Sequence, residues 1–356
     1  MISTGQKIAT ERVRVSRLAT TDLEKVTFGR TFSDHMFVMD HRDGGWREPR
    51  IVPYDDLRMS PASAVLHYAQ SIFEGLKAYR APDGKVNIFR PQENIARMNR
   101  SAERMCMPTL PEGVFMEALT ELVALDQDWI PKGDDAALYI RPFMMAADTY
   151  IGIRPSDTYT FIIFTCPVRS YYAEPVNVEI ETRFSRAFPG GTGEAKCAGN
   201  YGAALYPLKE ANARGIHQMI WTDALEHKYI EESGTMNVFF RIDDTLVTPE
   251  TGGTILRGVT RDSIITLARD MNVPLEVRRV TVDEVVDAAR NGRLKEAFGA
   301  GTAATIAHIR SITHQDEVYT LPPVEERQVS RSIGDRLDNI RRGREADPFG
   351  WLVPVG

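Results

Sequence analysis

The chain has 356 residues, of which 43% are hydrophobic and 26% are charged, and its formal net charge is -6. This length predicts two domains, and the composition is typical of a soluble globular protein. The mild acidic excess argues against a nucleic-acid partner, because phosphate binding requires a basic face. The three widely spaced cysteines indicate a reducing cytoplasm, and the seven histidines lack the spacing of a metal site. The N-terminus has no apolar signal-peptide core, and the most apolar stretch, residues 161–168, is too short to cross a membrane.

The first half of the chain mixes predicted helices and strands. Helical periodicity appears in residues 62–79, 90–106 and 111–130, the second of these with Pro91 near its start. The segment 34–46 is predicted to be a strand followed by an Asp-Gly-Gly turn, and 81–89 a turn followed by a short strand. Further strands are predicted in the apolar segments 136–147 and 159–168.

The polar segment that follows, with Pro175, is the best linker candidate. We therefore expect an N-terminal domain over residues 1–168, a linker over 169–179 and a C-terminal domain over 180–356. In the second half, strands are predicted in 176–182, 217–223, 237–249 and 296–309, the third as a hairpin around Asp243 and Asp244 and the last broken by a glycine turn. Helices are predicted in 204–215, 260–272 and 281–292.

A glycine-rich stretch, FPGGTGEAKCAGNYG over residues 188–202, carries one lysine, Lys196. It is not a Walker phosphate loop, since Ala195 precedes the lysine and Cys197 follows it, and the spacing of a dinucleotide-binding loop also fails. Two interpretations remain: a mobile surface loop with a solvated lysine, or a loop that presents a Schiff-base lysine from a glycine-lined pocket.

Chemistry on a pyridoxal phosphate cofactor needs three further groups, and each has a candidate. Glu231 or Glu232 supplies a carboxylate for the ring nitrogen; in an extended segment the two face opposite ways, so only one reaches the ring. Tyr201 supplies a phenol for the ring oxygen. The segment 258–260 opens a predicted helix whose amides and dipole favour a phosphate, and the turn 298–305 offers further amides and the hydroxyl of Thr302.

Together these segments resemble the branched-chain amino-acid aminotransferases, pyridoxal-phosphate enzymes of fold type IV. The resemblance rests on GGTGEAKCAGNYG, EESGTMNVFF, LRGVTRDSI, FGAGTAAT, SIFEGLKAY and FRPQENIARMNRSA, which occur in the family's order, and it runs from about Phe28 to the C-terminal GWLVPV. It implies a smaller N-terminal α/β domain and a larger β-rich C-terminal domain of pseudo-barrel type. It also implies a homodimer.

The resemblance assigns the cofactor residues. Lys196 binds pyridoxal phosphate covalently and shuttles a proton, Glu232 pairs with the pyridine nitrogen, and Tyr201 donates to the ring oxygen. The phosphate is held by Arg97, with Arg90 as a rival, and by three residues on other segments: Val259, Thr260 and Thr302.

It also assigns a substrate pocket, in which Thr302 and Ala303 bind the carboxylate. The remaining pocket residues are mostly aromatic: Phe28, Tyr68, Phe73, Tyr139, Tyr171 and Thr235. Such a pocket suits leucine, isoleucine and valine and discriminates poorly among them. Arg141 is expected to bind the distal carboxylate of glutamate, with a structural ion pair as the alternative.

The implied activity is transamination of these amino acids with 2-oxoglutarate by a ping-pong route. Some family members carry a Cys-x-x-Cys pair after the Gly-Thr turn, but Ala304 and Ala307 stand here, so we expect no thiol switch there. The loop 144–158 has no secure counterpart in the family pattern. Two alternatives stay open: another fold type IV enzyme, such as a D-amino-acid aminotransferase or an aminodeoxychorismate lyase, and a non-catalytic binding protein.

Overall fold

The computed structural model describes residues 7–169 and 174–356, and the chain divides into two compact units. Unit 1 comprises the chain up to Tyr171 together with Ala195–Gly199 and Ile340–Gly356. Unit 2 comprises Tyr172–Glu194 and Asn200–Asn339. Two segments that the sequence placed in the second domain, 195–199 and 340–356, thus cluster with unit 1. Residues 170–173 of the expected linker lie outside the described residues.

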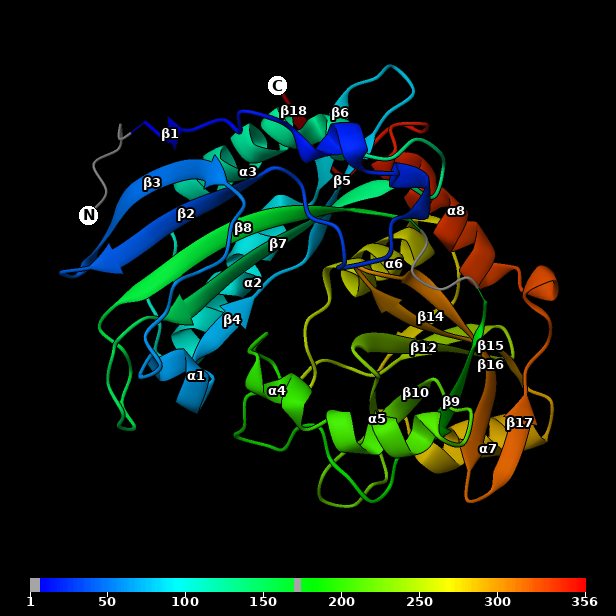
Figure 1. Cartoon of the computed structure of the whole chain (residues 1–356). Coiled ribbons are helices and arrows are strands. Elements are labelled where there is room, and N and C mark those ends of the chain that lie inside the picture. Colours follow the sequence, from blue (N-terminus) through cyan, green and yellow to red (C-terminus); the bar gives the residue numbers. More distant parts are fainter. Residues whose placement is uncertain (1–6, 170–173) are drawn as a thin grey trace. The chain divides into compact units, whose positions relative to one another are not determined.

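Unit 1 is built on a mostly antiparallel sheet (Figure 1). Its strands follow one another in the order β1-β3-β2-β8-β7-β5-β6-β18, and β4 pairs with β7 on the edge that β5 also uses. The longest pairing joins β7 and β8 over ten residue pairs. The strands are β1 (Ala9–Thr10), β2 (His35–Arg42), β3 (Gly45–Pro53), β4 (Ser71–Phe73), β5 (Leu76–Arg80), β6 (Val86–Phe89), β7 (Ala137–Ala146), β8 (Tyr159–Val168) and β18 (Leu352–Val355).

Two long helices of unit 1, α2 (Pro91–Arg104) and α3 (Glu112–Asp126), pack on each other and on strands of the sheet. Helix α2 begins with a proline in the first turn, where a missing N–H costs nothing, and turns Ile95, Met98 and Ala102 into the core. The remaining helical segments are short: α1 (Ala64–Tyr68), η1 (Arg17–Thr20), η2 (Leu23–Lys25) and η3 (Gln127–Trp129).

The predicted helix over residues 62–79 is wrong for most of its length. Helix α1 ends at Tyr68, and the capping residue Ala69 adopts a left-handed conformation with φ of 51°. The chain then forms β4 and β5, which pair with β7 far along the sequence. The helical periodicity in this segment was therefore overridden by strand pairing with a distant partner.

Unit 2 contains a closed sheet. Its strands follow the order β11-β10-β9-β16-β15-β12-β13-β14. An additional pairing of β11 with β12 closes the strands from β11 to β12 into a ring, β13 and β14 extend beyond β12, and β17 pairs with β16. Strand β9 pairs in parallel with β10 and β16, whereas the other pairs in the ring are antiparallel. The strands are β9 (Val176–Ile180), β10 (Gln218–Thr222), β11 (Ile230–Ser233), β12 (Met236–Ile242), β13 (Thr245–Thr248), β14 (Leu275–Val277), β15 (Leu294–Gly301), β16 (Thr305–His314) and β17 (Glu317–Thr320).

The predicted hairpin at Asp243 and Asp244 is confirmed in this sheet. The predicted break in the strand over 296–309 is also present, but it is the turn 302–304 between β15 and β16, and Gly299 and Gly301 lie within β15. The predicted helix after Thr281 is also confirmed, since the Thr281 hydroxyl accepts a hydrogen bond from the Glu284 amide. The helical segments between residues 199 and 341 are α4 (Gly199–Gly202), α5 (Leu205–Asn212), α6 (Val259–Asp270), α7 (Val282–Arg290), η4 (Val324–Glu326) and α8 (Val329–Arg341).

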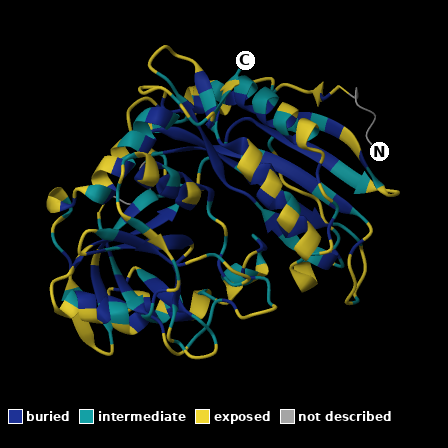
Figure 2. Ribbon diagram, turned by 180° about the vertical axis from the view of Figure 1, so that it is seen from behind, coloured by how far each residue is buried: buried dark blue, intermediate teal, exposed yellow. Residues whose placement is uncertain are grey.

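Each unit has a core of its own (Figure 2). The strands of both sheets are largely buried, and exposed residues concentrate on the outer faces of helices and in loops. Within the described residues, no helix is long and apolar enough to cross a membrane.

Candidate active site

Lys196 is held by backbone contacts with unit 1, even though the segments on both sides of Ala195–Gly199 belong to unit 2. Its carbonyl accepts from the Phe73 amide at 3.0 Å, and its amide donates to the Ser101 hydroxyl of α2 at 2.9 Å. The next residue, Cys197, forms a bridge with Ile72 of β4 and is buried. These contacts hold the backbone of this segment against β4 and α2, and the Lys196 side chain is half-buried. The Lys196 Nζ atom lies 4.7 Å from the centre of the Phe73 ring.

A buried ion pair joins the strand segment after β4 to helix α2. Glu74, fully buried, accepts from Arg97 Nε at 2.7 Å and from Arg97 Nη2 at 2.8 Å, and also from Asn94 Nδ2 at 2.7 Å. Burial by itself opposes ionisation, but Arg97, with smaller contributions from Lys196 and Asn94, brings the pKa of Glu74 below its ordinary value. The pair orients the Arg97 guanidinium and keeps Glu74 charged.

The aromatic residues predicted for the substrate pocket largely meet in unit 1. The Phe28 and Tyr139 rings pack edge to face at 5.0 Å. The Arg141 guanidinium lies over Phe73 at 4.7 Å and donates from Nη2 to the Tyr139 hydroxyl at 3.0 Å. The buried Arg141 Nε has no hydrogen-bond partner among the described residues. Arg141 thus lies against aromatic rings, and no structural ion pair of the kind offered as the alternative involves it within the described part of the chain.

Two other predicted residues add little here. Tyr68, at the end of α1, is 37% exposed, and its described ring contact is with His67. Tyr171 lies outside the described residues. The rival phosphate ligand Arg90 precedes α2, stacks over Trp351 at 5.1 Å and lies 3.7 Å from Glu93. Arg97, in contrast, donates to the buried Glu74.

In unit 2, both glutamates of β11 are buried, and they have different partners. Glu232 accepts from the Leu256 amide at 2.7 Å and lies 3.4 Å from Arg186 Nε. Glu231 accepts from the Thr254 hydroxyl at 2.5 Å, while its Oε2 has no hydrogen-bond partner among the described residues. Burial raises the pKa of Glu231.

Arg186 was missed by sequence reasoning. It lies in the segment before the glycine-rich stretch, and its side chain is 9% exposed. Besides contacting Glu232, it donates to the Thr254 carbonyl. Arg186 belongs to no recognisable motif, so the sequence does not mark it as a site residue. Its contact with Glu232 becomes visible only when the segments that carry Arg186, Glu232 and Thr254 come together in the fold.

The N-terminus of α6 follows the segment that contacts Glu232. Gly258 caps the helix in an extended conformation, with φ of -71°, and no side chain caps the helix there. A Cβ atom at Gly258 would lie 2.0 Å from the Asn237 side-chain oxygen. The same Asn237 donates to the Leu256 carbonyl at 2.9 Å. Glycine is therefore required where this loop presses on β12, and Val259 and Thr260 begin a helix whose dipole favours an anion.

The remaining predicted residues of unit 2 lie in turns or at short helices. Thr302 and Ala303 form the half-buried turn between β15 and β16, and Cβ atoms at Gly299 and Gly301 would come within 2.7 Å and 3.1 Å of Met236. Tyr201 is half-buried in α4, and Thr235 is exposed in the turn between β11 and β12. The predicted residues therefore form two sets, one in each unit.

The family of the chain follows from comparison with known proteins. Residues 71–312 match the family described as amino-transferase class IV, which is more than half of the chain. The chain belongs to this family.

Individual relatives narrow the comparison further. Over 338 residues the chain is 45% identical to branched-chain-amino-acid aminotransferase 2 of Bacillus subtilis (strain 168), covering 94% of this chain and 93% of that protein. Among solved structures, the branched-chain aminotransferase of Thermoproteus uzoniensis with norvaline matches with a TM-score of 0.74 and 26% identity, covering 90% of this chain and all of that one (100%). The branched-chain amino acid aminotransferase of Escherichia coli matches with a TM-score of 0.74 and 25% identity, covering 91% and 99%. The expected two-domain α/β fold of type IV is confirmed by these likenesses.

Proposed function

We propose that this protein is a pyridoxal-phosphate-dependent aminotransferase that moves the amino group of leucine, isoleucine or valine to 2-oxoglutarate, reversibly and by a ping-pong route. The observation that carries the proposal is Lys196, held by backbone hydrogen bonds to Phe73 and Ser101, in a chain 45% identical to a branched-chain-amino-acid aminotransferase. The products are the branched-chain 2-oxo acids and glutamate.

The donor groups of the two units fit pyridoxal phosphate. The cofactor requires an amine, a carboxylate for its ring nitrogen, a phenol for its ring oxygen and an anion site for its phosphate. Lys196 provides the amine, Glu232 the carboxylate and Tyr201 the phenol. The N-terminus of α6, capped by Gly258 and by no side chain, has the dipole and the backbone amides of an anion site.

The proposed phosphate ligands are Arg97 and the residues that begin α6, Val259 and Thr260, together with Thr302. Arg97 donates two hydrogen bonds to Glu74, at 2.7 Å and 2.8 Å. This pair fixes the orientation of the whole guanidinium, because its five N–H donors form one planar fork.

Lys196 is the proposed proton carrier. Pyridoxal phosphate, when bound, supplies an electron sink that stabilises negative charge at the substrate α-carbon. The Lys196 Nζ atom would take the proton from that carbon and would deliver it to the C4′ carbon of the bound cofactor. The nearby Phe73 ring, 4.7 Å from Nζ, keeps one side of the amine away from water.

The proposed substrate pocket uses the aromatic cluster of unit 1. Phe28, Phe73 and Tyr139, with Tyr68 and Tyr171, bind the aliphatic side chain. Arg141, whose Nε is buried without a hydrogen-bond partner among the described residues, binds the distal carboxylate of glutamate. Thr302 and Ala303 bind the α-carboxylate, and Thr235 completes the set.

We further propose that the enzyme is a cytoplasmic homodimer with domain boundaries near residues 168 and 180, as the resemblance to the family implies. Light scattering on the purified protein tests the dimer, and a monomer as the active species would refute it.

Three assays test the proposed function. Purified protein supplied with the cofactor is expected to be yellow, and borohydride reduction is expected to add the cofactor's mass to the peptide that contains Lys196. Steady-state rates with L-leucine should exceed those with D-alanine or aminodeoxychorismate, because the pocket is aromatic. A preference for either of the last two would assign another fold type IV activity.

The variant Lys196→Ala separates catalysis from binding. It is expected to lose transamination while still binding cofactor through the phosphate ligands, which absorbance measures after gel filtration. Turnover close to that of the wild type would refute the role of this lysine.

A further inference from the structure

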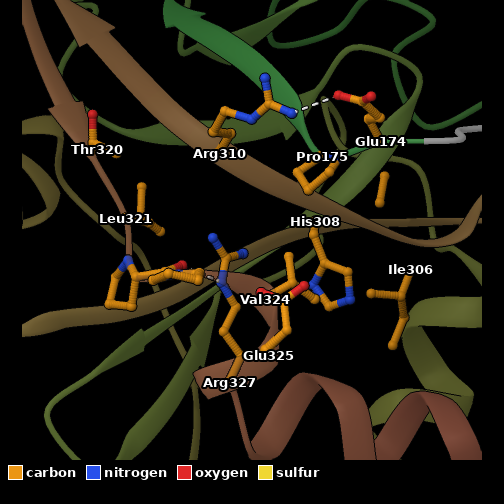
Figure 3. Close-up of a pocket in the computed structure, with 13 residues that line it drawn as sticks. Glu174, Pro175, Ile306, His308, Arg310, Thr320, Leu321, Val324, Glu325 and Arg327 are labelled. Atoms are coloured by element: carbon orange, nitrogen blue, oxygen red, sulfur yellow. Dashed lines mark hydrogen bonds and ion pairs between the residues drawn. The ribbon is translucent and has the colours of Figure 1, made fainter.

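A cavity lies in unit 2, and none of its lining residues belongs to the proposed active site. It measures about 550 Å³ and opens where β16 ends its pairing with β15 and begins its pairing with β17 (Figure 3). This volume falls in the range of small-ligand sites. Its wall combines aliphatic side chains, such as Ile306, Leu321 and Val324, with charged ones.

The inner wall of this cavity carries a buried positive charge. Arg327 is 2% exposed and donates to three backbone carbonyls: Pro322 at 3.0 Å, Ala297 at 3.3 Å and Ile309 at 2.8 Å. These bonds satisfy carbonyls at the point where β15 and β16 separate. Within the described parts of the chain, no carboxylate forms an ion pair with Arg327, although Glu296 and Glu325 lie close enough to favour its charge. Burial of the guanidinium opposes that charge, and two of its five N–H groups remain for a ligand.

A second polar group faces the same space. The Nδ1 atom of His308 is buried and has no hydrogen-bond partner among residues 7–169 and 174–356. Figure 3 shows this ring between Ile306 and Glu325. Burial, followed by the charge of Arg327, lowers the pKa of His308 to about 4, so the imidazole is neutral near pH 7 and offers one hydrogen bond to a ligand.

Negative charge lies at the rim of the cavity. Glu325 is exposed, and so is Glu174, which pairs with Arg310 at 2.8 Å. The cavity thus has a buried cation, an apolar wall and carboxylates near the solvent. This order of charges matches a zwitterion with a hydrocarbon side chain.

We propose that this cavity binds a free aliphatic α-amino acid. The carboxylate of the ligand contacts Arg327 and His308, its ammonium group faces Glu325, and its side chain packs on Ile306, Leu321 and Val324. The site is separate from the proposed catalytic residues and goes beyond the proposed transamination.

Calorimetric titration of the holoenzyme with α-methylleucine tests the proposal. This probe lacks the α-hydrogen and therefore cannot be transaminated. The variant Ile306→Trp fills the cavity and is expected to remove one binding site per chain relative to the wild type. The matched control Val318→Trp, on the exposed face of β17 at 62% exposure, is expected to keep the wild-type number of sites.

The chemistry of the ligand is tested at the same site. Glu325→Gln is expected to lower the affinity of the cavity for α-methylleucine by more than about tenfold. In the wild type, 4-methylpentanoate, which lacks the ammonium group, is expected to bind the cavity more than about tenfold more weakly than α-methylleucine does. Equal stoichiometry in wild type and Ile306→Trp would overturn the site. The amino-acid assignment would be overturned if the wild type bound 4-methylpentanoate as tightly as α-methylleucine and if Glu325→Gln bound α-methylleucine as tightly as the wild type. Unchanged kcat in Ile306→Trp confirms that this variant is folded.

Discussion

The substitution Glu74→Gln tests the buried network beside Lys196. Glu74 accepts two hydrogen bonds from Arg97 and one from Asn94, all between 2.7 Å and 2.8 Å. Glutamine keeps the size, but it replaces one acceptor oxygen with an NH2 group that faces a donor and removes the charge that balances Arg97. Hydrogen bonds to charged groups contribute about 1.5–3 kcal/mol each. Two lost bonds predict destabilisation by about 3–6 kcal/mol, close to the loss of about 3–5 kcal/mol for a broken buried ion pair.

Urea unfolding of the holoenzyme, followed by circular dichroism, measures this loss. The matched control is Glu93→Gln on the same helix, where the carboxylate is half exposed and lies 3.7 Å from Arg90. An exposed pair of this kind contributes at most about 1 kcal/mol. If the two variants unfold within about 0.5 kcal/mol of each other, the network does not hold α2 against β4, and the reasoning fails.

The same variant has a predicted pH dependence. Burial acts to raise the pKa of Glu74, but Arg97 outweighs it, so the pKa lies below the ordinary 4.5. A carboxyl group with a lowered pKa stabilises the fold above its ordinary pKa, and this stabilisation is lost as the pH falls through the pKa of the folded state. The difference between wild type and Glu74→Gln is therefore expected to be constant between about pH 5 and 8 and to shrink in more acidic solution. A difference that grows on acidification would contradict this assignment.

Two further predictions concern the site. Glu232→Gln is expected to lower kcat by more than about tenfold, or 1.4 kcal/mol of barrier, while Glu231→Gln keeps activity; the reverse order in steady-state assays would make Glu231 the ring partner. Gly75→Ala places a Cβ atom 2.2 Å from the Tyr139 hydroxyl and is expected to destabilise by about 1–3 kcal/mol in thermal unfolding. Gly113→Ala, where nothing lies within 4 Å of the new atom, should be neutral or stabilising, and equal losses in both would refute the clash.

The elements that depend on short-range signals were predictable. The cap at Thr281, the turn at Asp243 and the proline start of α2 each rest on interactions within a few residues, so the local sequence contains what is needed. The helix prediction for residues 62–79 was wrong for the opposite reason. The partner that makes β4 and β5 strands is β7, more than fifty residues further along, and local periodicity does not register it.

The candidate site divides in the same way. Motif order in the sequence selected Lys196, Arg97 and Glu232. Arg186 escaped notice, because its role depends on Glu232 and Thr254 approaching it from other segments.

The sequence by itself determined the family, the cofactor and the residue types that the chemistry needs, since these are carried by short motifs in a set order. The tertiary structure decided how some of those motifs are held. It attaches the five residues around Lys196 to β4 and α2, encloses Glu74 and Arg97 in the core of unit 1, and closes the sheet of unit 2 through β11 and β12. These features arise from hydrogen bonds and burial between segments distant in the chain, and no local pattern of side chains encodes such pairings.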